Sequence, residues 1–283
     1  MKKWSIALVL LFCGMCLFAQ SLFDLVQTGT PEQVQATIRA GAKLDNRDED
    51  GRTPLMYAAE YNENPAVVTT LLNAGAKLDD RDKDGRTPLM YAALNNVNPA
   101  VVTTLLNAGA KLDDRDKDGR TPLMYAALNN VNPAVVTTLL NAGAKLDDRD
   151  KDGRTSLMYA ALNNENPAVI TTLLNAGAKL DDRDKDGRTL LMYAAEYNEN
   201  PAVITTLLNA GAKLDDRDKN GMTPLMHAAW INMNPDVITT LLNAGANAKA
   251  KSNEGKTAFD YAQNNTKIKG TKAYWDLNNA LFR

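Results

Sequence analysis

The chain has 283 residues, of which 45% are hydrophobic and 23% charged, and its formal net charge is −2. Nucleic-acid binding calls for a strongly basic face, so this slightly acidic balance argues against it. Both cysteines, Cys13 and Cys16, lie within the first twenty residues. The rest of the chain therefore offers no disulfide framework, no thiol nucleophile and no thiolate metal site.

The first twenty residues differ in composition from everything that follows. Lys2 and Lys3 precede an uncharged apolar run from Trp4 to Phe18, and the small residue Ala19 comes next. This order is typical of a secretory signal peptide, and the run is short for a membrane span. We therefore predict a signal peptide at residues 1–19, a periplasmic or secreted protein, and no membrane insertion of the mature chain.

A lipoprotein anchored at Cys13 or Cys16 is the alternative interpretation. A bacterial lipidation motif has a small residue before its cysteine, whereas Phe12 and Met15 precede these two. The sequence therefore favours plain cleavage after Ala19. Cleavage would leave 30 of the 32 basic residues against 34 acidic ones, so the mature chain would be slightly more acidic.

One nine-residue pattern recurs along the chain at a fixed spacing of 34 residues. Its full form is Gly-Arg-Thr-(Pro/Ser)-Leu-Met-Tyr-Ala-Ala, with two close variants and one degraded copy. The copies begin at Gly51, Gly85, Gly119, Gly153, Gly187, Gly221 and Gly255. A period of this length indicates one supersecondary unit stacked on itself, which offers a long side-chain surface and no obvious closed pocket.

A single unit, residues 85–118, predicts two short helices and a charged loop. Thr87-Pro88 and Asn98-Pro99 are helix-start signals, because a side-chain oxygen caps free amide groups and proline fits the first helical position. Gly109 follows the second apolar stripe, where a left-handed residue ends a helix. The stretch 111–118 mixes basic residues with aspartates and leads into Asp-Gly, a hairpin-tip signal. Such short helices do not persist alone in water, so neighbouring copies must bury their apolar sides.

These residues resemble the ankyrin repeat. The resemblance rests on Asp-x-x-Gly-x-Thr-Pro-Leu at 82–89, the pair Ala92-Ala93, Val-Val-x-x-Leu-Leu at 101–106 and Leu-Leu-x-x-Gly-Ala at 105–110. It covers about residues 21–283. It implies an all-α repeat solenoid of stacked helix-turn-helix ankyrin repeats with β-hairpin or loop fingers, and a protein-binding module.

The ends of the array lack the full pattern, and arrays need atypical terminal units to keep their end faces soluble. We predict an N-terminal capping repeat at 20–50, six ankyrin repeats at 51–254 and a C-terminal capping repeat at 255–283. Within the array, Ser156 and Leu190 replace the helix-start proline. Methionine replaces the family's usual histidine after Thr-Pro-Leu, and a thioether cannot donate the hydrogen bonds by which that histidine ties neighbouring turns. These departures put local rigidity in question; the methionines are Met56, Met90, Met124, Met158, Met192 and Met226.

Candidate catalytic and metal-binding residues are few. His227 is the only histidine, and it stands in a first helix where other copies carry tyrosine, so we interpret it as a packed or partly exposed substitution. The sequence has no phosphate loop, histidine cluster or serine with a spaced base, so we predict no enzyme, no metal site and no cofactor. Asp80, Asp82 and Asp84 match the opening of a calcium loop, but Tyr91 stands at the twelfth position, where such a loop needs a carboxylate.

The two residues after each Ala-Ala pair are predicted to end the first helix and to point outward on the concave side. Three leucines then form a ladder, flanked by Glu-Tyr pairs and by a tryptophan at one end. Contiguous exposed apolar residues commonly mark an interaction site, and tyrosine and tryptophan are preferred anchors. The predicted partner-binding residues are Glu60, Tyr61, Leu94, Asn95, Leu128, Asn129, Leu162, Asn163, Glu196, Tyr197, Trp230 and Ile231. The alternative is that the leucines are duplicated without selection, since residues 85–118 and 119–152 are identical.

Two classes of function stay open on the sequence. The first is an exported, monomeric, non-catalytic module that binds a protein partner of unknown identity on the concave face. The second is a structural or calcium-dependent surface protein that uses the aspartate-rich fingers. Calcium-dependent melting would separate the two.

Overall fold

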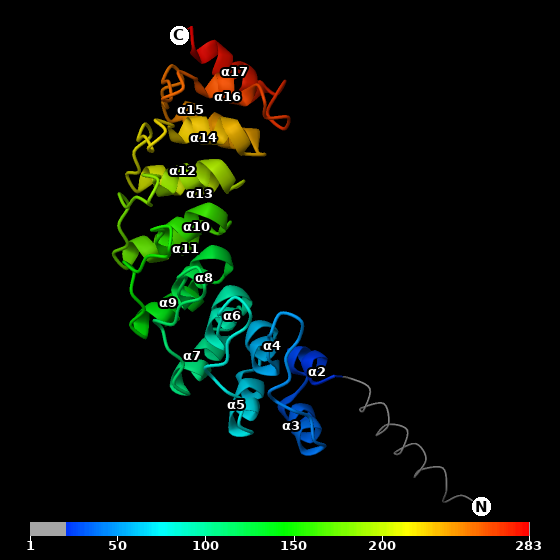
Figure 1. Ribbon diagram of the computed structural model, residues 1–283. Helices are drawn as coiled ribbons and strands as arrows, with labels where there is room; N and C mark the ends of the chain where they lie inside the picture. The colour runs from blue at the N-terminus through cyan, green and yellow to red at the C-terminus, as the bar shows by residue number, and fades with distance from the viewer. Residues whose placement is uncertain (1–20, 283) are drawn as a thin grey trace, which may run out of the picture.

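The computed structural model describes residues 21–282, so the predicted signal peptide at 1–19 lies outside the described residues. Within 21–282 the chain forms sixteen α-helices and no strand. The helices stack as pairs along a curved arc (Figure 1). The predicted all-α repeat solenoid is confirmed.

Each pair consists of a first and a second helix, and the loops between pairs form the fingers. The N-terminal pair is α2 (Leu22–Thr28) and α3 (Pro31–Arg39), and the C-terminal pair is α16 (Ala258–Ala262) and α17 (Lys272–Ala280). The first helices between them are α4 (Pro54–Tyr61), α6 (Pro88–Asn95), α8 (Pro122–Asn129), α10 (Ser156–Asn163), α12 (Leu190–Tyr197) and α14 (Pro224–Ile231). The second helices are α5 (Pro65–Asn73), α7 (Pro99–Asn107), α9 (Pro133–Asn141), α11 (Pro167–Asn175), α13 (Pro201–Asn209) and α15 (Pro235–Asn243).

The first helices are short and carry small side chains on their packed sides. In α6, Thr87 Oγ1 accepts a hydrogen bond from the backbone N–H of Met90 at 3.4 Å, and Pro88 fills the first helical position. Ala92 and Ala93 are fully buried. Because alanine takes little room, α6 and α8 lie in closer contact than α7 and α9 do. The first helices therefore line the inner side of the arc (Figure 1).

Each second helix buries one stripe of branched apolar side chains. In α7, Asn98 Oδ1 accepts a hydrogen bond from Ala100 N at 3.0 Å, and Val101, Val102 and Leu105 are fully buried. Burial of each of these side chains contributes about 1.5–3 kcal/mol. Gly109 follows the end of this helix, and its φ of 101° lets the N–H of the next residue reach back to the Leu105 carbonyl. A side chain there would meet no neighbouring atom, so the backbone conformation alone selects glycine.

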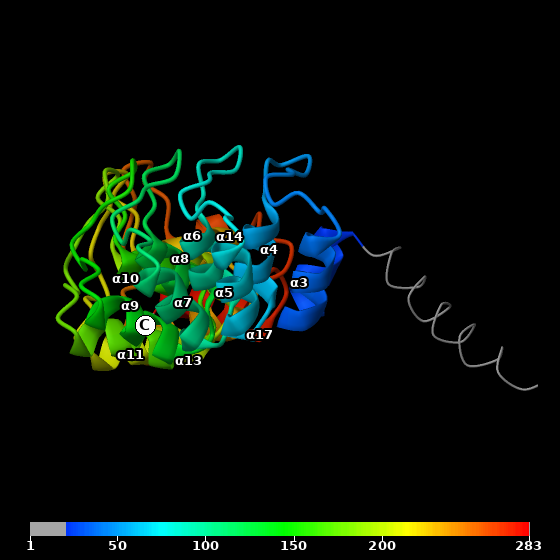
Figure 2. The same cartoon turned by 90° about the horizontal axis from the view of Figure 1, so that it is seen from below.

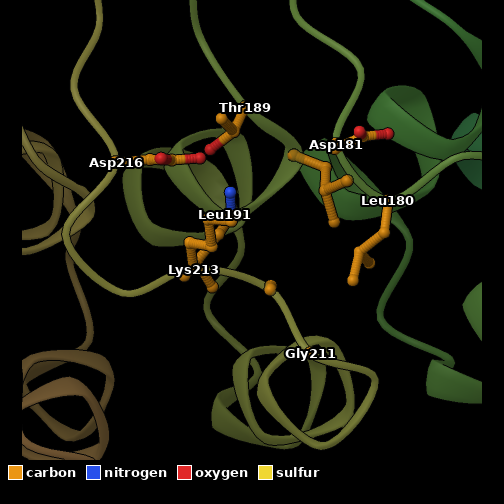
Figure 3. Close-up of a pocket in the computed structure, with 9 residues that line it drawn as sticks. Leu180, Asp181, Thr189, Leu191, Gly211, Lys213 and Asp216 are labelled. Carbon is orange, nitrogen blue, oxygen red and sulfur yellow. The ribbon is translucent and has the colours of Figure 1, made fainter.

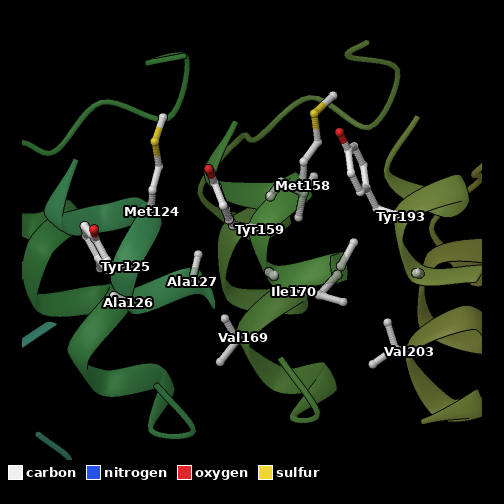
Figure 4. Close-up of a cluster of buried hydrophobic side chains, with 14 of the residues drawn as sticks. Met124, Tyr125, Ala126, Ala127, Met158, Tyr159, Val169, Ile170, Tyr193 and Val203 are labelled. Atoms are coloured by element: carbon white, nitrogen blue, oxygen red, sulfur yellow. The ribbon is translucent and has the colours of Figure 1, made fainter. Parts of the chain in front are cut away.

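The core runs unbroken along the array. Figure 4 shows Met158 and Tyr159 of one repeat beside Met124 and Tyr125 of the preceding one, with Ile170 of a second helix in the same layer. No repeat therefore has a core of its own. The apolar faces are satisfied by neighbours, as expected for a solenoid.

A buried row of asparagines joins consecutive repeats. Asn96 donates its amide N–H groups to the carbonyls of Ala59 and Asn62 in the preceding repeat, at 2.9 and 3.0 Å. Its Oδ1 accepts from Asn98 N at 3.0 Å. This asparagine ends each first helix and saturates polar groups that would otherwise be buried unpaired. The same arrangement recurs at Asn62, Asn130, Asn164, Asn198, Asn232 and Asn265.

The fingers project together from one side of the helices (Figure 2). Each tip is a single turn, in which Gly85 N donates to the Asp82 carbonyl and Asp82 N to the Arg86 carbonyl, both at 3.1 Å. Two such bonds do not make a strand ladder, so the fingers within residues 21–282 are loops and not strand hairpins. Neighbouring tips are joined by Lys83 N, which donates to the Asp50 carbonyl at 2.8 Å.

Arginines tie the fingers on a second line. Arg81 Nη1 donates to the carbonyl of Arg115 in the next finger at 2.9 Å, and its Nη2 pairs with Asp114 at 2.6 Å. These arginine bonds link neighbouring turns, as the family's usual histidine would do by its own hydrogen bonds. The replacing methionine also takes part locally, since Thr53 N donates to Met56 Sδ at 3.4 Å. The equivalents of Arg81 are Arg47, Arg115, Arg149, Arg183 and Arg217.

The two positions that lack a helix-start proline still begin helices. Leu190 is buried at the start of α12, where it replaces one apolar side chain by another. Ser156 is also buried, and its hydroxyl has no hydrogen-bond partner. The serine is therefore a local cost of about 1–3 kcal/mol that the stacked neighbours offset.

Candidate functional site

The predicted binding residues occupy the ends of the first helices on the inner side of the arc, and the structure divides them into three groups. Tyr61, Tyr197, Trp230 and Ile231 are exposed, at 47%, 47%, 48% and 39%. The leucines and asparagines of the central repeats are half-buried or exposed. The glutamates are buried. We call the twelve positions together the inner strip.

The prediction that both residues after Ala-Ala point to solvent is wrong for the glutamates. Glu60 is 5% exposed and Glu196 is 3% exposed. Each carboxylate is buried because an arginine of its own repeat covers it. Arg52 pairs with Glu60, and Arg188 Nη1 lies 3.4 Å from Glu196 Oε2. The two buried glutamates support the neighbouring tyrosines, Tyr61 and Tyr197, and do not present a free charge at the surface.

The leucine ladder is also less exposed than the sequence suggested. Leu94, Leu128 and Leu162 are half-buried and pack against the core. The reason is the close approach of consecutive first helices, which covers one side of each leucine with the next repeat. The ladder is a partly covered apolar seam, so it contributes to stability as well as to the surface.

Asparagine amides run beside the leucine seam. Asn95 donates to Glu60 Oε1 at 2.6 Å, and Asn129 donates to Asn95 Oδ1 at 2.8 Å. Asn163 Nδ2 reaches the Leu128 carbonyl at 3.5 Å. The amides are therefore held in register across three repeats. Amide side chains offer both a donor and an acceptor, so the strip can pair with polar groups of either kind.

Arginine–aromatic contacts stiffen the N-terminal end of the strip. The Arg52 guanidinium lies 4.0 Å from the ring centroid of Tyr57 and 4.4 Å from that of Tyr91. Burial opposes the charge on Arg52, but Glu60 and the tyrosines outweigh it and the pKa of Arg52 is raised. Arg52 therefore stays charged, and Glu60 and Tyr61 are held beside it.

The C-terminal end of the strip has different partners. Trp230 packs against Tyr261 of α16, with ring centroids 6.4 Å apart. Glu196 lies 3.0 Å from His227 Nδ1. Burial would raise the pKa of Glu196, but the contacts with His227 outweigh it and the pKa is lowered. This end thus combines three exposed apolar side chains, Tyr197, Trp230 and Ile231, with a buried ionised group.

Beneath the strip, each finger aspartate is bound to the following first helix, a contact that sequence reasoning missed. Asp116 Oδ2 accepts from Tyr125 OH at 2.6 Å and from Arg120 Nε at 2.7 Å. Its Oδ1 accepts from the backbone N–H of Arg120 and of Asp118, at 2.7 and 2.9 Å. Burial raises the pKa of Asp116, but these hydrogen bonds lower it by more, so the pKa lies below its ordinary value. The signal was present in the sequence as an aspartate nine residues before each tyrosine.

The aspartates that matched a calcium loop are engaged in protein contacts. Asp80 Oδ1 pairs with Arg47 at 2.7 Å, Asp82 accepts from the hydroxyl of Tyr91 at 2.6 Å, and Asp84 pairs with Arg86 at 3.0 Å. Tyr91 is buried. In the part of the chain that the structure describes, no group of three or more His, Cys, Asp or Glu side chains is arranged so that it could hold a metal ion.

The hollows between consecutive fingers repeat with the array. The one in Figure 3 lies among Leu180, Asp181, Gly211, Lys213 and Asp216, where the end of one second helix meets the next finger. Equivalent hollows are lined by Leu78, Arg81 and Lys111, and by Leu146, Arg149 and Lys179. Since the same hollow recurs at several junctions between units, it follows from the repeat geometry.

These features define a helix-pair solenoid with loop fingers and a continuous side-chain face, a class of protein–protein interaction scaffold. The family model for ankyrin repeats matches residues 22–116, 95–184, 163–252 and 191–271, which together span nearly all of the described chain. The chain belongs to the ankyrin repeat family. Ankyrin repeats are generally non-catalytic and imply protein partners. No curated protein matches the chain closely enough to count as a relative.

No helix between residues 21 and 282 has both the length and the apolar character needed to cross a bilayer.

Proposed function

We propose that this protein is a non-catalytic interaction module, exported to the periplasm or the cell exterior, that binds a protein partner along the concave inner strip. The proposal keeps the boundaries inferred from the sequence: a signal peptide at 1–19, caps at 20–50 and 255–283, and six repeats between them. The mature chain would act as a monomer.

One observation carries the choice of surface. Tyr61 at one end and Tyr197, Trp230 and Ile231 at the other keep about two fifths to one half of their surface exposed on an otherwise well-packed array. Large aromatic side chains on a rigid support are preferred anchors of protein interfaces. Their support is rigid because Glu60 and Glu196 are buried and paired beneath them. The central leucine seam and amide row would then serve as the complementary surface between two anchoring ends.

The experiment compares two triple variants of the mature chain as bait in affinity capture from the native cell envelope. Tyr61→Ala, Tyr197→Ala and Trp230→Ala together should abolish capture of the partner that the unchanged chain retains. The matched control is Thr103→Ala, Thr137→Ala and Thr171→Ala, since these threonines are exposed on the second helices. Circular dichroism should show that both triples keep the fold; the threonine triple should melt almost as the unchanged chain does, and the aromatic triple somewhat lower, since its side chains are about half buried. Equal capture by both would move the site away from the inner strip.

Export is tested separately. N-terminal sequencing of the protein from the native cell envelope should begin near Gln20. An intact Met1, or a lipid on Cys16, would overturn cleavage of a signal peptide and leave the binding proposal untouched.

A further inference from the structure

The buried finger aspartate just before the sixth repeat, which begins at Gly221, is held by a different cation from its counterparts before the earlier repeats. An arginine follows the glycine in the five preceding repeats, and in three of them it pairs with the finger aspartate, at 2.7, 3.0 and 3.5 Å. The sixth repeat has Met222 at this position. It also has His227 where the others have tyrosine. A permanent cation is thus replaced by a titratable one.

His227 connects two repeats. Its Nε2 lies 3.1 Å from Oδ2 of Asp218, the finger aspartate just before Gly221. Its Nδ1 lies 3.0 Å from Oε2 of Glu196, on α12 of the preceding repeat. All three side chains are at least nine-tenths buried. Among the described residues, His227 is the only cation within ion-pair distance of Asp218.

We propose that protonated His227 is a lock that joins the fifth and sixth repeats through Glu196 and Asp218, and that loss of its proton loosens this junction. The imidazolium carries an N–H on both ring nitrogens: Nε2 is hydrogen-bonded to Asp218, and Nδ1 lies within ion-pair distance of Glu196. Neutral imidazole donates from one nitrogen only, so a lone pair would then face one of the two carboxylates. A buried carboxylate left without its partner is strongly destabilising.

The charges around His227 favour its protonated form. Burial alone would lower the pKa of His227, but Asp218 and Glu196 raise it above its ordinary value of 6.5. Arg188 contacts Glu196 only, so the charge of the other carboxylate, Asp218, is left for His227 to balance. From the adjacent cap, Lys256 pairs with Glu254 at 2.7 Å and the Tyr261 hydroxyl donates to Ser252 at 3.0 Å, so neither side chain pairs with His227.

The lock sits beneath the C-terminal end of the inner strip. Tyr197 follows Glu196 directly, and Trp230 lies one helical turn beyond His227 on α14. Opening the junction would change the spacing of these two aromatic side chains. A pH effect on partner binding therefore rests on the proposed function, whereas the lock itself does not.

The first test reads the proton directly. Because the chain has a single histidine, its imidazole gives one set of NMR signals across a pH titration. We expect a midpoint above 6.5, and a lower midpoint in Glu196→Leu, which introduces the residue found at Leu94, Leu128 and Leu162. A midpoint at or below 6.5, or one that Glu196→Leu does not move, would overturn the lock.

The second test measures stability without any partner. Between pH 6 and pH 9 the melting temperature of the full chain should fall by about 2–4 °C more than that of His227→Tyr. Tyrosine occupies this position in five other repeats, so the variant should fold. The double variant Met222→Arg with His227→Tyr restores the pattern of the other repeats and should show the same reduced pH dependence. Equal pH dependence in all three proteins would refute the lock while leaving the binding proposal intact.

Discussion

The repeats that begin at Gly119 and Gly221 share one backbone design but differ in what holds the buried aspartate three residues before each glycine. Asp116 is held by Arg120 and Tyr125, whereas Asp218 is held by His227. The first arrangement is insensitive to pH near neutrality, because arginine does not lose its proton there. The difference shows that a uniform scaffold can carry a local property at one junction without any change of fold.

The same contrast holds on the surface. The central repeats present half-buried leucines and linked amides, and the terminal ones present exposed tyrosine and tryptophan. The identical central copies therefore lie between two distinctive ends. Four predictions test this division between centre and end, in order of decreasing expected effect.

Removal of residues 255–283 should cost far more stability than deletion of one central copy, residues 85–118. The cap buries Ile268 and Leu277 completely, and these two side chains alone account for about 3–6 kcal/mol. The internal deletion leaves a shorter array whose neighbours still match, because the next copy is identical. Urea unfolding of both proteins measures the difference. An unfolded internal deletion beside a folded cap deletion would contradict the assignment of the cap.

Asn130→Ala should destabilise the centre of the array by about 2–4 kcal/mol. The variant removes two amide bonds into the preceding repeat, at 3.0 and 2.9 Å, and leaves the carbonyls of Ala93 and Asn96 buried without partners. Asn130→Asp should be at least as damaging near neutral pH, because a carboxylate would face both carbonyls. Asn129→Ala, one residue earlier and exposed, is the control and should cost under about 1 kcal/mol. Similar losses at both positions would show that the buried row is not what joins the repeats.

Asp116→Asn should cost about 1–3 kcal/mol at pH 7 and should flatten the acid limb of the stability curve. The pKa of Asp116 is lowered by folding, so its contribution is fully present above the ordinary value near 3.8 and is lost as pH falls through the lowered one. Denaturant melts from pH 7 to pH 2 give both quantities. Asp218→Asn sharpens the comparison, since its cost should be smaller at pH 9 than at pH 7 if His227 has lost its proton there. An unchanged cost at pH 9 would mean that His227 does not act on Asp218 through charge.

Calcium should leave the protein unchanged. The aspartates of the fingers already pair with Arg47 and Arg86 or accept from Tyr91, so binding would have to break these contacts. We expect equal melting temperatures with millimolar calcium and with chelator, and a flat isothermal titration of the mature chain. A stoichiometric exothermic curve would favour a calcium-dependent surface protein.

Much of the fold could be predicted because its information is local and repeated. Thr87-Pro88, Asn98-Pro99 and Gly109 set helix starts and a stop through capping and backbone conformation, which depend on a few neighbouring residues. Each of these weak signals recurs every 34 residues, and the recurrence makes the prediction much stronger than one copy would. The caps at either end were inferred in the same way, from where the pattern fades.

The candidate site could be located along the chain but not resolved into exposed and buried members. Because all twelve residues directly follow an Ala-Ala pair, the sequence placed them at the ends of the first helices. Whether Glu60 or Tyr61 faces solvent depends on Arg52, which comes eight residues before the glutamate and folds back over it. Such contacts are invisible to a periodicity argument, because they depend on how one element packs on the next.

The sequence by itself determined the architecture, the family and the order of the repeats, since capping, stripe and turn signals act over a few residues and recur in every copy. Tertiary structure alone decided which charges became internal. Stacking brings Glu196, Asp218 and His227 from separate segments into one buried cluster, and the low polarity of that setting gives their charges an effect that none would have on an exposed helix.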